Sequence, residues 1–401
     1  MRAERYLSRL ASSIPPSGIR KFFDLVAEMD DAISLGVGEP DFPTPWNARD
    51  AAVKSIQKGY TRYTSNAGLP ELRKAAAAYF RERFDLGYDP ADEILITVGA
   101  SEAIDLCFRA ILDPGDEVLI PQPSYVSYAP NVTLCGGKPV PVECFERDDF
   151  KVRPENLERA VTEKTKAVLL PYPNNPTGAV MEREALEALV PVIQRHDLLA
   201  VSDEIYCELT YGSPHVSIAS LPGMRERTLV INGFSKAFSM TGWRVGLLAA
   251  PREFLKVILK IHQYVIMCAP SMGQYAALEA LKSGLRDNFA EVARMRAQYD
   301  MRRRFMVKSL NDMGLHCFEP RGAFYVFPSV ESLDMDGEAF ADALLREQKV
   351  AVVPGSAFGE SGRHFVRMSY AYSMRSLDEA VARISEFVSR HRADGKAARR
   401  P

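Results

Sequence analysis

The chain has 401 residues, of which 47% are hydrophobic and 25% charged, and its formal net charge is −2. This balance is ordinary for a folded globular protein and excludes a disordered chain or a collagen-like repeat. No apolar run approaches the roughly 18 residues that span a bilayer, so we expect no membrane partner. A charge near zero provides no general attraction for nucleic acid, so we expect no such partner either.

The first ten residues carry four charges, at Arg2, Glu4, Arg5 and Arg9, and no continuous apolar stretch follows them. This is not the pattern of a secretory signal. The six cysteines lie at uneven spacings without a Cys-x-x-Cys pair, which indicates reduced and mostly buried thiols rather than a metal site. We therefore expect a cytoplasmic protein that binds no metal.

Strands and helices alternate through the first two thirds of the chain. Residues 1–45 are rich in Pro and Gly and predict irregular structure, and a helix opens at about residue 70. Helices are predicted near 101–112, 182–195 and 252–265. Apolar runs of strand length lie at 94–98, 118–121, 139–142, 166–172, 198–202, 228–232 and 244–250. This alternation favours an α/β fold with a mostly parallel sheet covered by helices on both faces.

The pattern changes after about residue 270. A long charged helix is predicted at roughly 285–313, ending at Gly314, and a final helix at 376–391. Between them lie strands near 323–327, 350–353 and 365–369 and a helix near 337–347. We expect an N-terminal segment (1–45) that joins a smaller α+β C-terminal domain (276–401), and a large domain (46–275) between them.

Polar residues follow four strands of the large domain, at the point where each strand ends. These turns are Gly99-Ala100-Ser101, Asn174–Gly178, Asp203–Tyr206 and Gly233–Lys236. Each alone has an ordinary interpretation as a helix cap, a turn or a solvated cation. Because ligands bind at the carboxyl ends of strands in open α/β sheets, we expect the four turns to face one crevice.

Three motifs resemble the signatures of class I/II aminotransferases, which are fold-type I enzymes dependent on pyridoxal 5′-phosphate (PLP). They are Asn175-Pro176-Thr177-Gly178, Ser202-Asp203-Glu204-Ile205-Tyr206 and the element from Ser235-Lys236 through Gly242-Trp243-Arg244-Val245-Gly246. The resemblance extends from Gly18 to the last helix. It implies the PLP-dependent transferase fold, with a large PLP-binding domain and a smaller domain.

The resemblance assigns catalytic roles to several of these residues. Lys236 resembles the lysine that holds the aldehyde of the cofactor, and Asp203 the carboxylate that keeps its pyridine nitrogen protonated. Tyr206 and Asn175 resemble the pair that bonds the ring oxygen O3′. Tyr125 resembles the aromatic residue that stacks on the ring.

The phosphate of the cofactor needs backbone N–H groups at a helix start and a cation. Gly99, Ala100 and Ser101 match the helix start, and Arg244 resembles the phosphate-binding arginine of the family. Ser235 is expected to add a hydroxyl group.

The resemblance also predicts substrate-binding residues and a homodimer with shared active sites. Arg367 resembles the arginine that binds the substrate α-carboxylate, and Gly38 the glycine that lines the substrate site. Tyr63 matches a tyrosine that reaches the phosphate of the neighbouring subunit, although an ordinary partly buried aromatic residue is the alternative. Arg20 and Lys21 are cations for which a solvated face is the favoured interpretation.

The reaction stays open to more than one interpretation at this point, because fold does not determine function. We predict an aminotransferase that moves an amino group between an L-amino acid and 2-oxoglutarate by a ping-pong mechanism. A PLP-dependent carbon–sulfur β-lyase or a ring-forming synthase is the alternative. A ligand-sensing regulator is disfavoured, because too few residues precede Gly18 for a DNA-binding domain.

Two loops indicate which substrates the enzyme is expected to accept. Ser101 stands where bacterial aspartate-type relatives often carry a lysine that helps to hold a distal carboxylate, which argues against a strict aspartate specificity. Residues 99–105 and 64–68 are more similar to the PatA-type group, which includes aromatic and N-acetyl-diaminopimelate aminotransferases. We expect glutamate and 2-oxoglutarate as one substrate pair, and an aromatic, acidic or lysine-pathway compound in the other.

Overall fold

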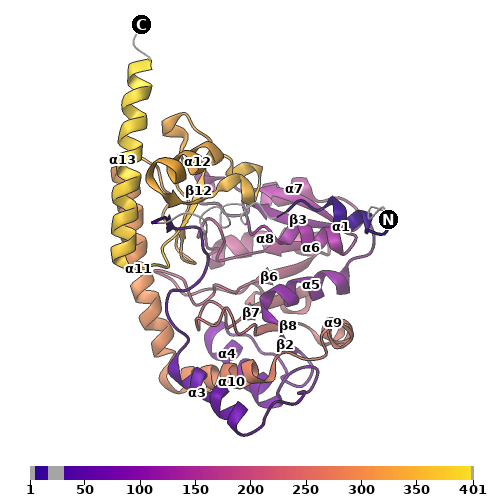
Figure 1. Cartoon of the computed structure of the whole chain (residues 1–401). Helices are drawn as coiled ribbons and strands as arrows, with labels where there is room; N and C mark the ends of the chain where they lie inside the picture. Colours follow the sequence, from indigo (N-terminus) through magenta and orange to yellow (C-terminus); the bar gives the residue numbers. More distant parts are fainter. Residues whose placement is uncertain (1–4, 17–30, 399–401) are drawn as a thin grey trace.

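The computed structural model describes residues 5–16 and 31–398, and seven strands within them form a central sheet. The order of the strands is β2–β8–β7–β6–β5–β3–β4 (Figure 1). Each overlaps a strand that the apolar runs predict. The strands are Ile94–Thr97 (β2), Glu117–Gln122 (β3), Lys138–Glu143 (β4), Thr165–Leu170 (β5), Leu199–Asp203 (β6), Thr228–Gly233 (β7) and Gly246–Ala249 (β8).

The predicted mostly parallel sheet is confirmed, with β8 as the exception. β8 runs antiparallel to both of its neighbours, β2 and β7. A buried apolar run carries no information on strand direction, so the sequence pattern did not reveal this reversal. Because β2 and β7 point the same way on either side of β8, the carboxyl ends of β2, β5, β6 and β7 lie at one edge. Gly246 begins β8 at that edge, opposite Thr97 and Gly233.

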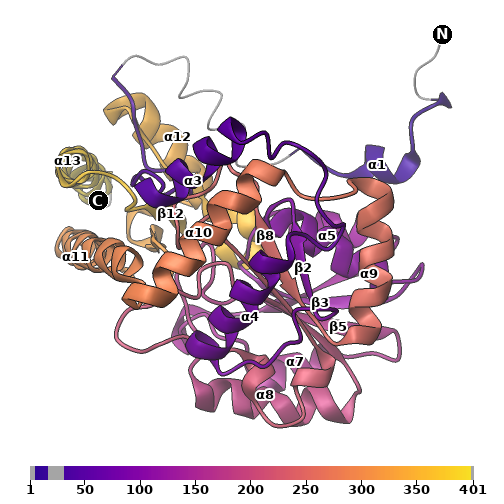
Figure 2. The ribbon, with the colours of Figure 1, turned by 90° about the horizontal axis from the view of Figure 1, so that it is seen from below.

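Helices cover both faces of this sheet, since successive strand side chains are apolar on both sides. On one face, Val201 and Ile231 pack against α5 (Gly99–Ile111) and α9 (Arg252–Val265). On the other face, Ile96 and its neighbours pack against further helices. Figure 2 shows where these helices lie relative to the sheet. The helices on that side are α4 (Pro70–Phe84), α7 (Pro154–Ala160), α8 (Arg183–Arg195) and α10 (Ser271–Asp287), with α3 (Trp46–Gln57) packed on α10.

A second group of elements lies to one side of the sheet in both views (Figures 1 and 2). Its own apolar core includes Phe324, Phe340 and Phe387. The N-terminal part of the chain contains α1 (Arg9–Ser13) and, further along, β1 (Ile33–Ser34). β1 pairs in parallel with β10 (Val350–Ala351) and so joins this group. The group contains α11 (Ala290–Asp312), α12 (Gly337–Gln348), α13 (Met374–Ala398), β9 (Tyr325–Val326), β10 (Val350–Ala351), β11 (Val353–Pro354) and β12 (Val366–Ser369).

The predicted single helix at 285–313 is wrong at its start. Two helices, α10 and α11, meet there, and the break consists of Asn288 and Phe289, which both have positive φ angles (53° and 56°). Asn adopts this conformation readily, whereas a bulky Phe does so only when packing enforces it. The ring of Phe289 is buried beneath α10, against Gly284. The predicted domain boundary at residue 275 falls within α10, and the three-part division stays a prediction.

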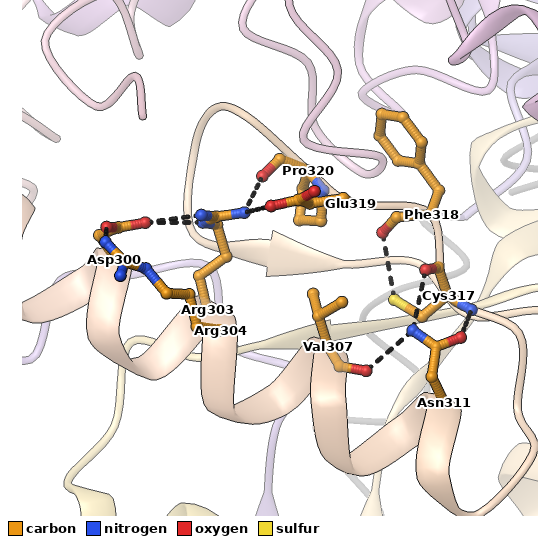
Figure 3. Close-up of polar contacts among 9 residues, drawn as sticks. All are labelled: Asp300, Arg303, Arg304, Val307, Asn311, Cys317, Phe318, Glu319 and Pro320. Carbon is orange, nitrogen blue, oxygen red and sulfur yellow. Dashed lines mark hydrogen bonds and ion pairs between the residues drawn. The ribbon is translucent and has the colours of Figure 1, made fainter. Parts of the chain in front are cut away.

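Arg303 joins α11 to the loop that precedes β9 (Figure 3). Its guanidinium pairs with Asp300 on the same helix at 2.8 Å and with Glu319 on the loop at 2.7 Å. It also donates a hydrogen bond to the carbonyl of Pro320. Two turns further along the helix, Asn311 exchanges hydrogen bonds with the backbone of the same loop. The loop is therefore held to α11 at two neighbouring points before the chain enters β9.

We expect Arg303→Met to lower the free energy of unfolding by about 2 kcal/mol, because Arg303 is almost fully buried and its hydrogen bonds to charged groups are lost. Arg304→Met is the matched control: Arg304 also pairs with Asp300 but is 71% exposed, so its loss should change the free energy of unfolding much less. Chemical denaturation of both variants tests this. Equal losses would show that the loop contact contributes nothing beyond a surface ion pair.

Candidate active site

A cavity of about 690 Å³ lies at the carboxyl edge of the sheet, against the second group of elements. The predicted crevice is therefore present. The predicted site residues that line it are Gly38, Ala100, Ser101, Tyr125, Asn175, Asp203, Tyr206, Ser235, Lys236, Arg244 and Arg367. Gly99 lies directly behind the wall of this cavity, and Tyr63 lies outside it.

Asp203 is the last residue of β6 and is only 4% exposed. The hydroxyl of Tyr128 donates to its Oδ2 at 2.8 Å, and the N–H of Ile205 donates to its Oδ1 at 3.2 Å. Burial raises the pKa of Asp203 to about 6, although these hydrogen bonds act in the opposite direction. A cationic group in the cavity would stabilise the carboxylate. The sequence did not identify Tyr128, because a tyrosine that opens a helix has no distinguishing pattern.

Lys236 follows β7 and faces Asp203 across the cavity. Its Nζ donates to the carbonyl of Gly38 at 2.6 Å and lies 5.5 Å from the ring centre of Tyr206. The pKa of Lys236 is lowered to about 8, mainly by burial; Glu39 opposes this shift, and the nearby cations Arg367 and Arg244 contribute to it. A substantial fraction of this amine is therefore neutral near pH 8, as a nucleophilic lysine requires.

Two phenols meet in the wall of the cavity. The hydroxyls of Tyr206 and Tyr325 are 2.8 Å apart, and both side chains are buried. Burial raises the pKa of each phenol, so both stay protonated at neutral pH. The sequence predicts a strand over Tyr325, but it does not distinguish a tyrosine at the site from an ordinary aromatic residue of the core.

Arg367, on β12, is 2% exposed and enters the cavity from the opposite side. Its Nη1 donates to Oδ1 of Asn175 at 2.8 Å, and its Nη2 donates to the carbonyl of Gly36. Its guanidinium lies 4.6 Å from the ring centre of Tyr325 and 4.9 Å from that of Phe358. The Nε of Arg367 is buried and has no hydrogen-bond partner. The cation is therefore rigidly placed and keeps donor capacity for an anion.

Gly99 and Arg244 meet at the start of α5. Gly99 has a φ of +72°, and a Cβ at this position would lie 2.6 Å from Nη2 of Arg244, so only glycine fits. Arg244 also has a positive φ (54°), and its Nη1 donates to the carbonyl of Thr241 at 2.9 Å. The backbone N–H groups of Ala100 and Ser101 belong to the same first turn of α5. A helix N-terminus with an adjacent guanidinium is suited to bind an anion.

The remaining predicted residues are placed as follows. Tyr125 lines the cavity, with its ring perpendicular to that of Tyr128 at a centre distance of 5.6 Å. Ser235 lines it as well and is 8% exposed. Tyr63 is 80% exposed and contributes nothing to the cavity of its own chain. Arg20 and Lys21 lie outside the described residues.

The residues of this cavity fit pyridoxal 5′-phosphate. An amine suits its aldehyde, a buried carboxylate suits a protonated pyridine nitrogen, and the anion-binding helix end suits a phosphate. Tyr206 supplies a phenol and Asn175 an amide, and both side chains line the same cavity. The guanidinium of Arg367, which lines the same cavity, suits a carboxylate.

Comparison with known proteins identifies the family. The profile of the family described as "Aminotransferase class I and II" matches residues 30–384. A putative aminotransferase, YugH, of Bacillus subtilis is 53% identical, covering 96% of this chain and 98% of that protein. A probable N-acetyl-LL-diaminopimelate aminotransferase of the same organism is 47% identical, covering 97% of each chain.

The chain belongs to the class I and II aminotransferases. The crystal structure of an aromatic aminotransferase from Pyrococcus horikoshii superposes with a TM-score of 0.88 at 43% identity, over 93% of this chain and 99% of the other. The predictions of an amino-acid aminotransferase, of its fold and of its PLP dependence are thereby confirmed. The lyase or synthase alternative is not favoured.

Two further properties concern the described part of the chain alone. No helix there is long and apolar enough to cross a membrane. Across residues 5–16 and 31–398, no group of three or more His, Cys, Asp or Glu side chains could hold a metal ion.

We expect Asp203→Asn to raise the free energy of unfolding of the cofactor-free protein at about pH 8 by about 1–3 kcal/mol. The pKa of Asp203 is raised from 3.8 to about 6, so its ionised form destabilises the fold above pH 6 and has no such effect below pH 4. The gain should therefore disappear at about pH 4. Denaturation at both pH values measures it, with the exposed Asp113→Asn as control. A gain that did not depend on pH would contradict the assignment of a buried, destabilising charge.

Proposed function

We propose that the enzyme transfers an amino group between an L-amino acid and 2-oxoglutarate, with Lys236 as the lysine that carries pyridoxal 5′-phosphate. The observation that supports this most directly is the placement of Arg367. Its guanidinium is oriented by Asn175 and Gly36, keeps an unpartnered donor, and shares one cavity with Lys236. An α-carboxylate is the group that every amino and keto acid substrate has in common, and a fixed planar cation suits it.

When bound, the cofactor supplies an electron-accepting ring that stabilises negative charge on the α-carbon of the substrate. We assign the residues of the chain to the steps around that carbon. Lys236 takes the proton from the α-carbon of the amino donor. In the second half of the transfer, it delivers a proton to the α-carbon of the keto acid that becomes the new amino acid. Its lowered pKa is suited to both steps. Asp203 holds a proton on the pyridine nitrogen, and Tyr128 orients its carboxylate.

Three further groups hold the reactants in place. Tyr206 and Asn175 bind the ring oxygen, and Tyr125 packs on the ring face. Arg244 and Ser235, with the N–H groups at 99–101, bind the phosphate. Gly38 lines the cavity next to Tyr325, and a larger residue does not fit there because its Cβ would lie 2.3 Å from the hydroxyl of Tyr325.

For the substrate range, we propose an aromatic, acidic or lysine-pathway amino compound as the partner of the glutamate and 2-oxoglutarate pair. The cavity wall includes the apolar side chains of Val37, Ile104 and Val126 as well as Ser101. Apolar lining favours contact with a hydrocarbon side chain over a second carboxylate. The names of the relatives, which include aromatic and N-acetyl-LL-diaminopimelate aminotransferases, support the same range.

We propose a homodimer in which Tyr63 completes the phosphate site of the partner subunit. Tyr63 is 80% exposed, and on the same surface the end of α9 exposes Tyr264 (87%) and Val265 (62%). Asn66 donates to the carbonyl of Met267 at 2.7 Å, which joins the loop of Tyr63 to the end of α9. Exposed apolar surface of this extent is typical of an interface between subunits. We also propose a cytoplasmic location, which suits the six free thiols.

The kinetic test uses glutamate and a panel of aromatic, acidic and diaminopimelate-type donors against 2-oxoglutarate. We expect parallel double-reciprocal lines, because the amino group rests on the enzyme between two half-reactions. Arg367→Lys keeps the charge but loses the planar fork, so KM should rise for amino and keto acid together, by about tenfold or more. Intersecting lines, or a KM change for one substrate alone, would overturn the assignment.

Mixing variant subunits tests the shared site. Tyr63→Phe and Lys236→Ala should each be impaired as homodimers, whereas a hybrid dimer has one site with both residues intact. Activity of the mixture should therefore exceed that of either parent after subunit exchange. No gain, despite hybrid dimers shown by native mass spectrometry, would mean that each chain completes its own site.

A further inference from the structure

A buried histidine lies directly behind the helix start that we assign to the phosphate. His262, on α9, is 0% exposed, and its Nδ1 is 2.7 Å from Oε1 of Glu102 on α5. The other oxygen of Glu102, Oε2, accepts the N–H of Val98 at 2.5 Å. The Nε2 of His262 is buried and has no hydrogen-bond partner. None of these three residues lines the cavity.

Glu102 presents an electrostatic problem for an anion site. It lies in the first turn of α5, one residue after Ser101, where the helix N–H groups attract carboxylates. A carboxylate free to rotate there would compete with a phosphate for the N–H groups at Ala100 and Ser101. Its charge would also repel the phosphate at short range.

The two contacts of Glu102 resolve this problem. Oε2 is bound to the N–H of Val98, which precedes the helix, and Oε1 is bound to His262 on a neighbouring helix. With both oxygens engaged in this way, the carboxylate is not hydrogen-bonded to the N–H groups at 100 and 101. Those groups are then available to an anion.

The burial of His262 argues that this contact is more than packing. A buried imidazole with one unpartnered nitrogen costs free energy relative to an apolar side chain of similar size. The hydrogen bond from Nδ1 to Glu102 is its one side-chain polar contact in the described structure. A carboxylate accepts hydrogen bonds, so we assign Nδ1 of His262 as the donor in this contact.

We propose that His262 is a positioning residue for cofactor binding: it restrains Glu102 so that the helix start at 99–101 binds the phosphate. This inference rests on the proposed role of that turn. It concerns affinity for the phosphate of the cofactor and leaves the ring-binding residues unaffected.

The experiment measures the binding of PLP, and of pyridoxal, which lacks the phosphate, to the full-length protein stripped of cofactor. Absorbance titration gives the dissociation constants. His262→Phe should weaken PLP binding by about tenfold, which corresponds to the loss of one hydrogen bond, and should leave pyridoxal binding unchanged. His262→Gln, whose amide can still donate to Glu102, should stay close to wild type.

A charge-removing variant tests the mechanism itself. Glu102→Gln alone should bind PLP at least as well as wild type, and Glu102→Gln in the His262→Phe background should restore most of the lost affinity. This arm remains decisive even where His262→Phe alone folds poorly. Equal weakening of PLP and pyridoxal, failure of the double variant to recover, or a tenfold loss in Glu102→Gln would each overturn the proposal.

Arg244→Gln separates this inference from the proposed function. If Arg244→Gln weakens PLP binding and His262→Phe does not, the turn binds the phosphate and the role of His262 is wrong. If neither variant changes the affinity for PLP, the phosphate site itself is misassigned, and the inference fails together with it.

Discussion

The structure depends on one constraint, which is that Asp203, Lys236 and Arg367 are held largely out of water without an oppositely charged side chain paired to them. Asp203 and Arg367 are almost fully buried, and Lys236 is enclosed enough for its pKa to fall to about 8. Burying a charge is costly unless it is paired, so these side chains destabilise the empty fold. The same cost becomes binding free energy when a ligand supplies the missing partners. A cofactor with a protonated nitrogen and a substrate with a carboxylate supply them.

The fold places these charges by combining two kinds of support. The carboxyl ends of parallel strands set Asp203 and Lys236 on one rigid edge, where neighbouring strands fix their spacing. The second group of elements contributes Arg367 and Tyr325 from two adjacent strands, β12 and β9. α11 holds the loop before β9 through Arg303, so the contact in Figure 3 supports the cavity wall from a distance. Polar side chains at the cavity thus rest on apolar cores on both sides.

The sequence predicted the strands and the turns after them because buried apolar runs and Gly- or Asn-rich turns are local signals. Other features depend on contacts between distant segments, which no local pattern records. The reversal of β8 and the break at Asn288 and Phe289 are of this kind. So are Tyr128 and Tyr325, whose hydroxyls gain a role only because packing brings them to Asp203 and Tyr206. The interpretation of Tyr63 depends on a second chain.

The N-terminal segment connects the two sides of the site more closely than its irregular sequence suggests. Its carbonyls at Gly36 and Gly38 accept from Arg367 and Lys236, so one short stretch of backbone contacts both the cation that we propose for the substrate and the amine that we propose for the cofactor. β12 adds a hydrogen bond to the same stretch, at the carbonyl just before Gly36. A shift of this segment therefore changes the position of Arg367 and the solvation of Lys236 together. On the proposed assignment, a carboxylate bound at Arg367 would therefore affect the surroundings of Lys236 through backbone rather than through side chains.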